Sequence, residues 1–221
     1  GQYYYIPDNW YDEAFRDSFR QEYTLSVSGA KDRLNYYGSV GYLDDGGIVN
    51  NSDYRRYTAR VNVDWQAKPW IKVLSSMSYS HTDSQRPSYT SSYGSAGNIF
   101  YVANMMGPIY PLYVRNADGT IMYENGMKVY DSNQTNFARP AFVGNAVRDN
   151  ELDSKQTYAD MLTGKWGVVL TPVKGLSLTA NIGLTNDNTR YNAMYSRFGS
   201  QSATDGLAYV SHQRTFAVNS Q

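Results

Sequence analysis

Two stretches of the chain alternate apolar and polar residues at every second position. In the first stretch the apolar residues are Tyr57, Ala59, Val61, Val63 and Trp65. The second stretch runs from Leu176 to Leu184 with the same period. Because successive side chains of a β-strand point to opposite faces, each stretch predicts a strand with one apolar and one polar face. About ten residues of this pattern suffice for one strand of an outer-membrane β-barrel.

Composition argues against several other classes of protein. The chain has 221 residues and a mean hydropathy of -0.58, and it lacks the run of about 20 apolar residues that a membrane-spanning helix needs. Its 20 basic and 20 acidic residues cancel without forming a basic stripe, so no nucleic-acid partner is expected. Without cysteine there is neither a disulfide framework nor a thiolate zinc site. The 22 tyrosines suit membrane interfaces, glycan surfaces and protein interfaces alike.

The expected strands are joined by connections that alternate between short and long. Strands are expected at residues 21–28, 34–42, 54–65, 70–81, 158–170 and 176–185, with part of a seventh at 214–218. Short turns are expected at 29–32, 66–69 and 171–175, with Gly29 taking a positive φ, and long connections at 44–53, 82–155 and 186–206. In an antiparallel meander every second connection lies at the same end of the sheet. All short turns therefore gather at one end, as they do in outer-membrane barrels.

Aromatic residues stand near the ends of the expected strands, where a girdle at the membrane interface would place them. They are Tyr42, Trp65, Trp70, Tyr79 and Trp166. The pattern favours an all-β antiparallel meander that forms part of a large transmembrane β-barrel. Two alternatives stay open. One is a soluble, Tyr-rich β-sandwich that binds carbohydrate, in which the alternation only separates core from solvent. The other is a structural surface protein without a transport role.

Several blocks of the sequence carry a family resemblance. They are residues 9–16 (NWYDEAFR), 25–29 (LSVSG), 37–44 (YGSVGYLD), 47–49 (GIV), 54–64 (YRRYTARVNVD) and 107–113 (GPIYPLY), the last followed by Asp118 and Gly119. In this order and spacing they resemble the SusC/RagA family of TonB-linked (TonB-dependent) outer-membrane transporters. Residues 9–16 are similar to that family's DWQDEIFR segment, and residues 54–64 to its FKRYTARLNLD strand. Together the blocks cover most of the chain.

The resemblance implies a transporter with an N-terminal plug inside a 22-stranded barrel, a plugged lumen of the kind known for such barrels. It implies energy input from TonB through the plug, a SusD-like lipoprotein as partner, an oligosaccharide (glycan) or peptide substrate, and the outer membrane of a Gram-negative bacterium of the Bacteroidetes type. No plug, TonB-contacting segment or closing C-terminal strand is recognised in the sequence. Residues 1–20 are expected in an extracellular loop and residues 21–221 in part of the barrel, as an internal piece of a longer protein.

Catalytic and cofactor-binding patterns are not recognised, so neither an enzyme nor a cofactor or metal site is expected. His81 and His212 are far apart in the sequence and lack the spacing of a metal-binding motif. Residues 116–119 (NADG) resemble part of a calcium loop but lack its distal Glu, and they are interpreted as a turn at the tip of a hairpin.

The long connection at residues 82–155 is the expected functional surface, because loops of this length usually carry function. Aromatic residues that could stack on sugar rings or pack against a partner are Tyr93, Phe100, Tyr101, Tyr110 and Tyr113. Packing within the loop is the alternative for each of them, and Met105, Met106 and Phe142 could form a small loop core. Arg139 and Arg148 could pair with a carboxylate of the loop or of a ligand.

The polar residues of the third strand are expected to face the lumen of the barrel. They are Arg60, Asn62 and Asp64, which alternate with the apolar residues of the same strand. An Arg on the lipid face at mid-bilayer would cost roughly 2–4 kcal/mol, so the charged side must be the inner one.

Overall fold

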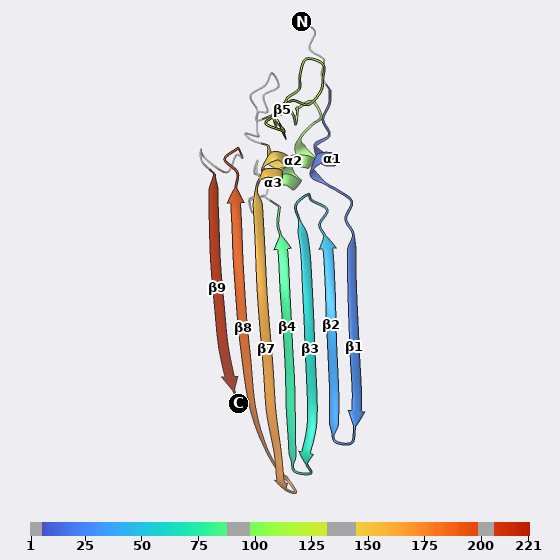
Figure 1. The fold of residues 1–221 in the computed structure, drawn as a ribbon, viewed down its shortest axis with the longest axis vertical. Coiled ribbons are helices and arrows are strands. Elements are labelled where there is room, and N and C mark those ends of the chain that lie inside the picture. Colours follow the sequence, from blue (N-terminus) through green and yellow to red (C-terminus); the bar gives the residue numbers. More distant parts are fainter. Residues whose placement is uncertain (1–5, 88–97, 132–144, 199–205) are drawn as a thin grey trace.

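The computed structural model describes residues 6–87, 98–131, 145–198 and 206–221. Its main feature within these residues is a seven-stranded antiparallel sheet in the order β1-β2-β3-β4-β7-β8-β9 (Figure 1). The strands are β1 (Arg20–Lys31), β2 (Leu34–Gly46), β3 (Asp53–Lys68), β4 (Ile71–Gln85), β7 (Ser154–Val173), β8 (Leu176–Tyr195) and β9 (Leu207–Ser220). The short turns lie at one end of the sheet and the long connections at the other, which confirms the predicted meander (Figure 1).

The strand bounds differ from the sequence-based expectation most at the end of β8 and the start of β9. Strand β8 continues to Tyr195, so the connection expected at 186–206 is shorter, and β9 begins at Leu207 rather than near Arg214. Residues 186–190 of β8 are all polar and have no apolar alternation, but both neighbouring strands pair with them: Asn188 lies opposite Asp160 of β7 and Arg214 of β9. Backbone pairing, which the side-chain pattern does not report, therefore extends the strand.

One of the tight turns also differs in detail from the expectation. The positive φ of the first turn belongs to Asp32, at 51°, and not to Gly29. Gly29 lies inside β1 opposite Tyr36, whose ring occupies the space that a Cβ at Gly29 would need. The turn between β7 and β8 has its positive φ at Gly175, at 90°, where no other atom would contact a Cβ and the backbone conformation alone favours glycine.

The register of the strands aligns apolar side chains on one face of the sheet and polar side chains on the other. Residues facing each other across an antiparallel pair share a face. One apolar row is formed by Val27, Gly38, Val61, Met77, Gly164, Leu184 and Val218. The adjacent polar row is formed by Ser26, Ser39, Arg60, Ser78, Thr163 and Thr185. We call these two sides of the sheet the apolar face and the polar face.

The apolar face is largely exposed. Leu25 is 74% exposed, Val61 53% and Trp65 50%, although each points to the same side as other large apolar residues. Nothing in the described part of the chain packs over this face as a second layer. A folded chain in water would cover such a surface, so the face is suited to an apolar environment.

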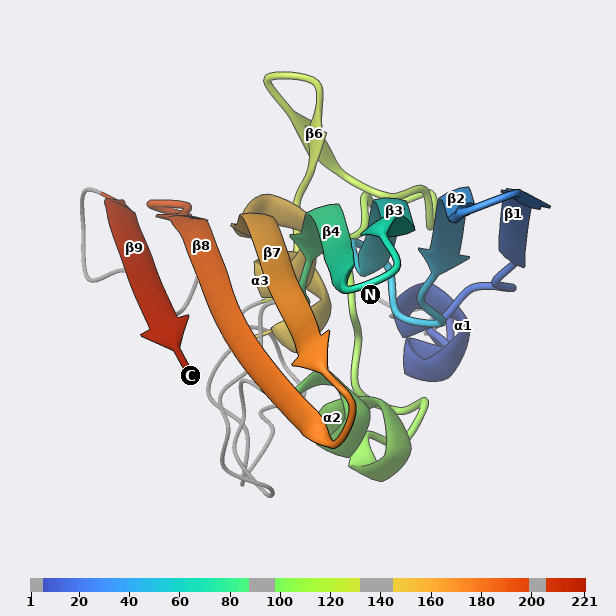
Figure 2. The ribbon, with the colours of Figure 1, turned by 90° about the horizontal axis from the view of Figure 1, so that it is seen from below.

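The hydrophobic core lies outside the sheet, at the end that carries the long connections (Figure 1). Here α1 (Trp10–Ala14), α2 (Ile99–Met105) and α3 (Ala146–Leu152) pack together with residues 106–131, which include the small hairpin β5 (Tyr123–Glu124) and β6 (Met127–Lys128). We call the described residues 6–19, 98–131 and 145–153 the loop module. Seen from below, α1 and α2 lie to one side of the strands and β6 to the other (Figure 2). No described helix is long and apolar enough to cross a membrane.

Each helix of the loop module begins after an asparagine whose side chain caps it. The Oδ1 atoms of Asn9, Asn98 and Asn145 accept hydrogen bonds from backbone N–H groups two or three residues further on. Asparagine is among the best N-cap residues, because its side chain satisfies N–H groups that have no partner within the helix. These caps explain how helices of one or two turns form in a stretch that has no helical periodicity.

Candidate functional site

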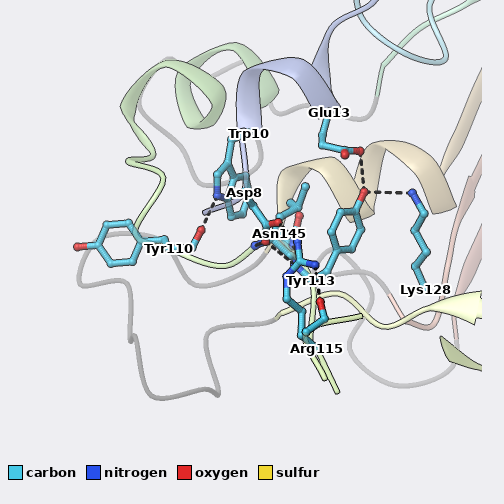
Figure 3. Close-up of polar contacts among 10 residues, drawn as sticks. Asp8, Trp10, Glu13, Tyr110, Tyr113, Arg115, Lys128 and Asn145 are labelled. Atoms are coloured by element: carbon cyan, nitrogen blue, oxygen red, sulfur yellow. Dashed lines mark hydrogen bonds and ion pairs between the residues drawn. The ribbon is translucent and has the colours of Figure 1, made fainter. Parts of the chain in front are cut away.

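The loop module is held together by a buried ion pair between distant parts of the chain (Figure 3). The carboxylate of Asp8 is 6% exposed as a residue and accepts a hydrogen bond from the guanidinium of Arg115. Its other oxygen accepts from the backbone N–H groups of Leu112, at 2.7 Å, and Tyr113, at 3.3 Å. Charge-assisted hydrogen bonds of this kind compensate for the loss of water around a buried carboxylate. Asp8 therefore fixes the strand-like segment around Leu112 to the N-terminal part of the chain.

Two further side chains tie the same segment to its neighbours (Figure 3). The indole N–H of Trp10 donates to the carbonyl of Tyr110 at 2.8 Å. The Nδ2 group of Asn145 donates to the carbonyls of Leu112, at 3.0 Å, and Asp131, at 3.1 Å. Trp10 is 1% exposed and Asn145 is fully buried. The interior of the module is thus a packed core crossed by hydrogen bonds between distant segments of the chain.

Tyr113 is a core residue of the module and not an exposed one. It is 3% exposed, its ring lies 5.1 Å from that of Tyr130, and its hydroxyl donates to Glu13 Oε2 at 2.7 Å. The ammonium group of Lys128 lies 3.3 Å from the same hydroxyl and 4.8 Å from the ring centroid. Burial, followed by the hydrogen bond to the Glu13 carboxylate, raises the pKa of Tyr113 far above its ordinary value. The phenol therefore stays protonated, and its side chain packs within the loop.

The other residues expected on the ligand- or partner-facing surface fall into two groups. Tyr101 and Tyr110 are half-buried residues of the loop module, and Phe100, which directly precedes Tyr101, is 40% exposed. Tyr93 and Arg139 lie outside the described residues, as does Phe142. The exposed aromatic surface of the described module therefore includes Phe100 and the accessible parts of Tyr101 and Tyr110.

Arg148 and Met106 both make contacts inside the loop module. Arg148 pairs with the buried carboxylate of Asp149 at 3.1 Å, so it meets a carboxylate of the loop. Met106 is 7% exposed and belongs to the core, whereas Met105 is 60% exposed. The expectation of a small methionine-containing core is thus met by one of the two neighbouring methionines.

The turn at residues 116–119 has the structure expected of a hairpin tip. Its backbone N–H at Gly119 donates to the carbonyl of Asn116 at 3.0 Å, and Gly119 has a φ of 87°. Asp118 Oδ1 accepts from the hydroxyl of Thr120 at 2.6 Å and from its backbone N–H at 3.0 Å. These two hydrogen bonds lower the pKa of the Asp118 carboxyl. The carboxylate is engaged in closing the turn.

The three polar residues of β3 stand together on the polar face. Arg60 lies opposite Ser39 and Ser78, on the adjacent strands β2 and β4. Asn62 Oδ1 accepts from the hydroxyl of Ser76 at 2.8 Å. Asp64 pairs with Lys72 at 3.2 Å. The polar face is a hydrogen-bonded surface, and whether it lines a lumen stays a prediction.

Sequence reasoning did not identify the residues that hold the loop module together. Asp8 and Arg115 are 107 positions apart, and Trp10 and Tyr110 are 100 apart. The local signal that was available is the repeated asparagine in front of each short helix. That signal indicates a helix start but not which segments pack together.

Comparisons with known proteins point to one group. No family model matches the chain. The TonB-dependent receptor SusC of Bacteroides thetaiotaomicron is 42% identical over 55 residues, which are 25% of this chain and 6% of that protein. The TonB-dependent receptor P26 of Formosa agariphila is 23% identical over 192 residues, which are 87% of this chain and 17% of that protein. The chain thus spans less than a fifth of the length of these curated relatives.

Solved structures show the same architecture. The structure of the RagAB peptide transporter matches with a TM-score of 0.65 and 21% identity, over 97% of this chain and 23% of that one. The RagAB peptide importer in its closed-closed state matches with a TM-score of 0.62 and 21% identity over the same shares. At this identity the likeness is one of fold: the seven-stranded sheet corresponds to a piece of barrel wall. The receptors matched in sequence and the solved structures agree: the chain is similar to a partial barrel segment of TonB-dependent outer-membrane receptors of the SusC/RagA type.

Proposed function

We propose that the chain forms part of the wall and the outer loops of a TonB-dependent importer that takes up glycans or peptides across an outer membrane. The observation that carries this proposal is the register-aligned, exposed apolar face opposite a polar face. In a barrel the apolar face contacts lipid and the polar face lines the interior. Arg60, Asn62 and Asp64 would then face the lumen.

The height of the apolar face supports a membrane as its environment. On β3 the apolar residues run from Tyr57 to Trp65, eight steps of roughly 3.3 Å, or about 26 Å along the strand. With a strand tilt of about 40° this is roughly 20 Å of height, and the aromatic rings at both borders add to it. An apolar band of about 25 Å is typical of outer-membrane barrels.

Aromatic side chains mark both borders of this band. At one border Tyr42 and Tyr57 lie side by side with ring centroids 5.1 Å apart. At the other border Trp65 and Trp70 are 50% and 44% exposed. Tyrosine and tryptophan combine an apolar ring with a polar group, which favours the interface between lipid and water. A soluble β-sandwich, the alternative, would instead place its apolar face against a second sheet.

The loop module fits a role at the outer surface. Under this proposal residues 1–20 and the long connection at 82–155 lie outside the cell, and the short turns lie in the periplasm. The buried contacts of Asp8 and Asn145 make the module a rigid support for the aromatic residues at its edge. Tyr101 and Tyr110 would contact substrate or partner, and Tyr93 and Arg139, which lie outside the described residues, are proposed for the same role from the sequence alone.

The relatives support a proposal for the partners and the substrate class. RagAB is described as a peptide importer and transporter, and the receptors matched in sequence are described as TonB-dependent. We infer a SusD-like lipoprotein as the outer partner, TonB acting through a plug, and a Bacteroidetes-type outer membrane as the location. Neither an enzymatic reaction nor a cofactor is part of this function.

Uptake by cells that carry or lack the full-length receptor tests the proposal. Labelled peptides and labelled oligosaccharides are supplied separately, with a protonophore as the control for TonB-dependent energy input. We expect uptake of one class to require both the receptor and the proton gradient. Uptake of both classes that is the same in cells with and without the receptor, or a protein that fractionates as a soluble monomer, would contradict the proposal.

A further inference from the structure

The apolar face continues past its border into a polar region on β7, β8 and β9. The last large apolar residues before this region are Leu162, Leu184 and Phe216. Beyond them the same face carries two adjacent rows. One row contains Asp160, Asn188 and Arg214, and the other contains Tyr158, Arg190 and His212. Two arginines and a histidine are thus neighbours on a single face.

The two arginines lack acidic partners in the part of the chain that the structure describes. Arg190 Nε donates to Asn192 Oδ1 at 3.2 Å, and Arg214 Nε donates to Asn186 Oδ1 at 3.4 Å. Both acceptors are neutral, so both positive charges stay uncompensated by ion pairs. The nearest acidic row member, Asp160, already accepts from Tyr79 at 2.6 Å and lies 2.7 Å from His81 Nδ1.

The same face carries compensated charges elsewhere. On β2 and β3, at the same end of the sheet, Arg55 pairs with Asp44 at 3.5 Å. At this end of the sheet, among the described residues, the two arginines of this face that have no acidic partner thus lie on β8 and β9. We call Arg190, His212 and Arg214 the cation patch.

A hollow lies next to the cation patch. It has a volume of about 660 Å³ and is bounded by His81 and Asp160 on one side and by Arg190, Val210 and His212 on the other. The exposed side chains of Arg190 and His212 thus border a recess rather than a flat surface.

The position of the cation patch relative to the apolar band indicates which kind of molecule the patch would bind. Arg214 is two residues beyond Phe216, about 7 Å along the strand, on the face that the proposed function turns toward lipid. This level corresponds to the layer of lipid headgroups. Arginine binds phosphate through several N–H groups, and basic residues at a membrane surface attract anionic headgroups.

We propose that the cation patch binds the phosphate of an outer-leaflet lipid headgroup. The inference rests on the proposed function, since it needs the apolar face to contact lipid. The hollow would receive the part of the headgroup that carries the phosphate, and Arg190 and Arg214 would neutralise its charge. The bound lipid would lie against the outside of the barrel wall and not in the substrate path.

The test uses the full-length receptor in nanodiscs of phosphatidylcholine that contain increasing amounts of diphosphorylated lipid A. The measured quantity is the lipid A phosphate retained per receptor. We expect the double variant R190Q/R214Q to bind lipid A about 30-fold more weakly than the unmodified receptor, roughly fivefold for each arginine. The variant R190K/R214K keeps both charges and should retain most of the binding.

Arg56 provides a matched control. It lies on the polar face near the same end of the sheet, paired with Glu22 at 3.8 Å. We expect R56Q to retain lipid A as the unmodified receptor does. Equal retention by R190Q/R214Q would overturn the inference, and so would displacement of lipid A by an equal concentration of inorganic phosphate.

Heat-modifiable migration in gels separates this inference from the proposed function. A receptor that inserts and shows the migration of a folded barrel, but retains lipid A independently of the patch, contradicts the lipid site alone. A receptor that does not insert into nanodiscs at all contradicts both the proposed barrel and the lipid site.

Discussion

An arginine placed at each of two successive positions of β3 distinguishes the two faces of the sheet by the loss of folding free energy that it causes. Val61 is 53% exposed and lies midway along the apolar part of the strand, between the borders at Tyr57 and Trp65. An Arg at the middle of the lipid face costs about 2–4 kcal/mol. Asn62 is the next residue, on the polar face, where an Arg loses only the hydrogen bond from Ser76, worth about 1 kcal/mol. We therefore expect V61R to destabilise the folded barrel more than N62R by roughly 1–3 kcal/mol.

The assay is folding of the full-length receptor into phospholipid vesicles over a range of urea concentrations, read by heat-modifiable migration. At a urea concentration near the midpoint of the unmodified receptor, a difference of about 2 kcal/mol lowers the folded-to-unfolded ratio about 30-fold. Y57R is the control for depth, because an Arg at the border of the band costs only about 0–1 kcal/mol. We expect the folded-to-unfolded ratio of V61R to be far below the ratios of N62R and Y57R.

Two results would refute the reasoning. Equal loss of folded receptor in V61R and N62R would show that the two faces do not differ in environment. Equal loss in V61R and Y57R would show that the cost does not depend on depth, as expected for a soluble sheet packed against another protein layer.

Two further predictions concern the loop module, and in both the readout is the rate of proteolysis of the loops in the folded full-length receptor. D8N removes the charge that compensates Arg115 and should destabilise the module by about 3–5 kcal/mol, whereas D17N, at an exposed residue, should leave proteolysis unchanged; equal rates would contradict the anchoring role of Asp8. N145A removes the cap of α3 and two donors to buried carbonyls and should cost about 2–4 kcal/mol, against about 1 kcal/mol for N98A, which removes only a cap. Similar proteolysis rates in N145A and N98A would argue that the two buried hydrogen bonds contribute little.

The sequence predicts the sheet well because the alternation of apolar and polar residues that marks a strand is a local pattern. The alternation from Tyr57 to Trp65 reports which side chains face an apolar environment, and the structure places these residues on one face. Residues 186–190 of β8 have no such signal, since both faces are polar there and pairing with β7 and β9 holds the backbone extended.

The loop module could not be predicted from the sequence, because its contacts join residues that are about a hundred positions apart. Tyr113 illustrates the difficulty. A tyrosine in a long polar segment suits an exposed binding surface, yet its burial depends on Glu13, Lys128 and Tyr130. No local pattern marks these residues as neighbours, and only the asparagine caps indicate that short helices form there.

The most direct test of the account is the environment of successive residues of β3 in the membrane-inserted receptor. Single cysteines at positions 59 to 64, in an otherwise cysteine-free full-length receptor, would carry a fluorophore and be exposed to a lipid-attached or a water-soluble quencher. The account predicts that the lipid quencher acts at positions 59, 61 and 63 and the water-soluble quencher at 60, 62 and 64. Quenching without a period of two, or with the two sets exchanged, would contradict the assignment of the apolar face to lipid.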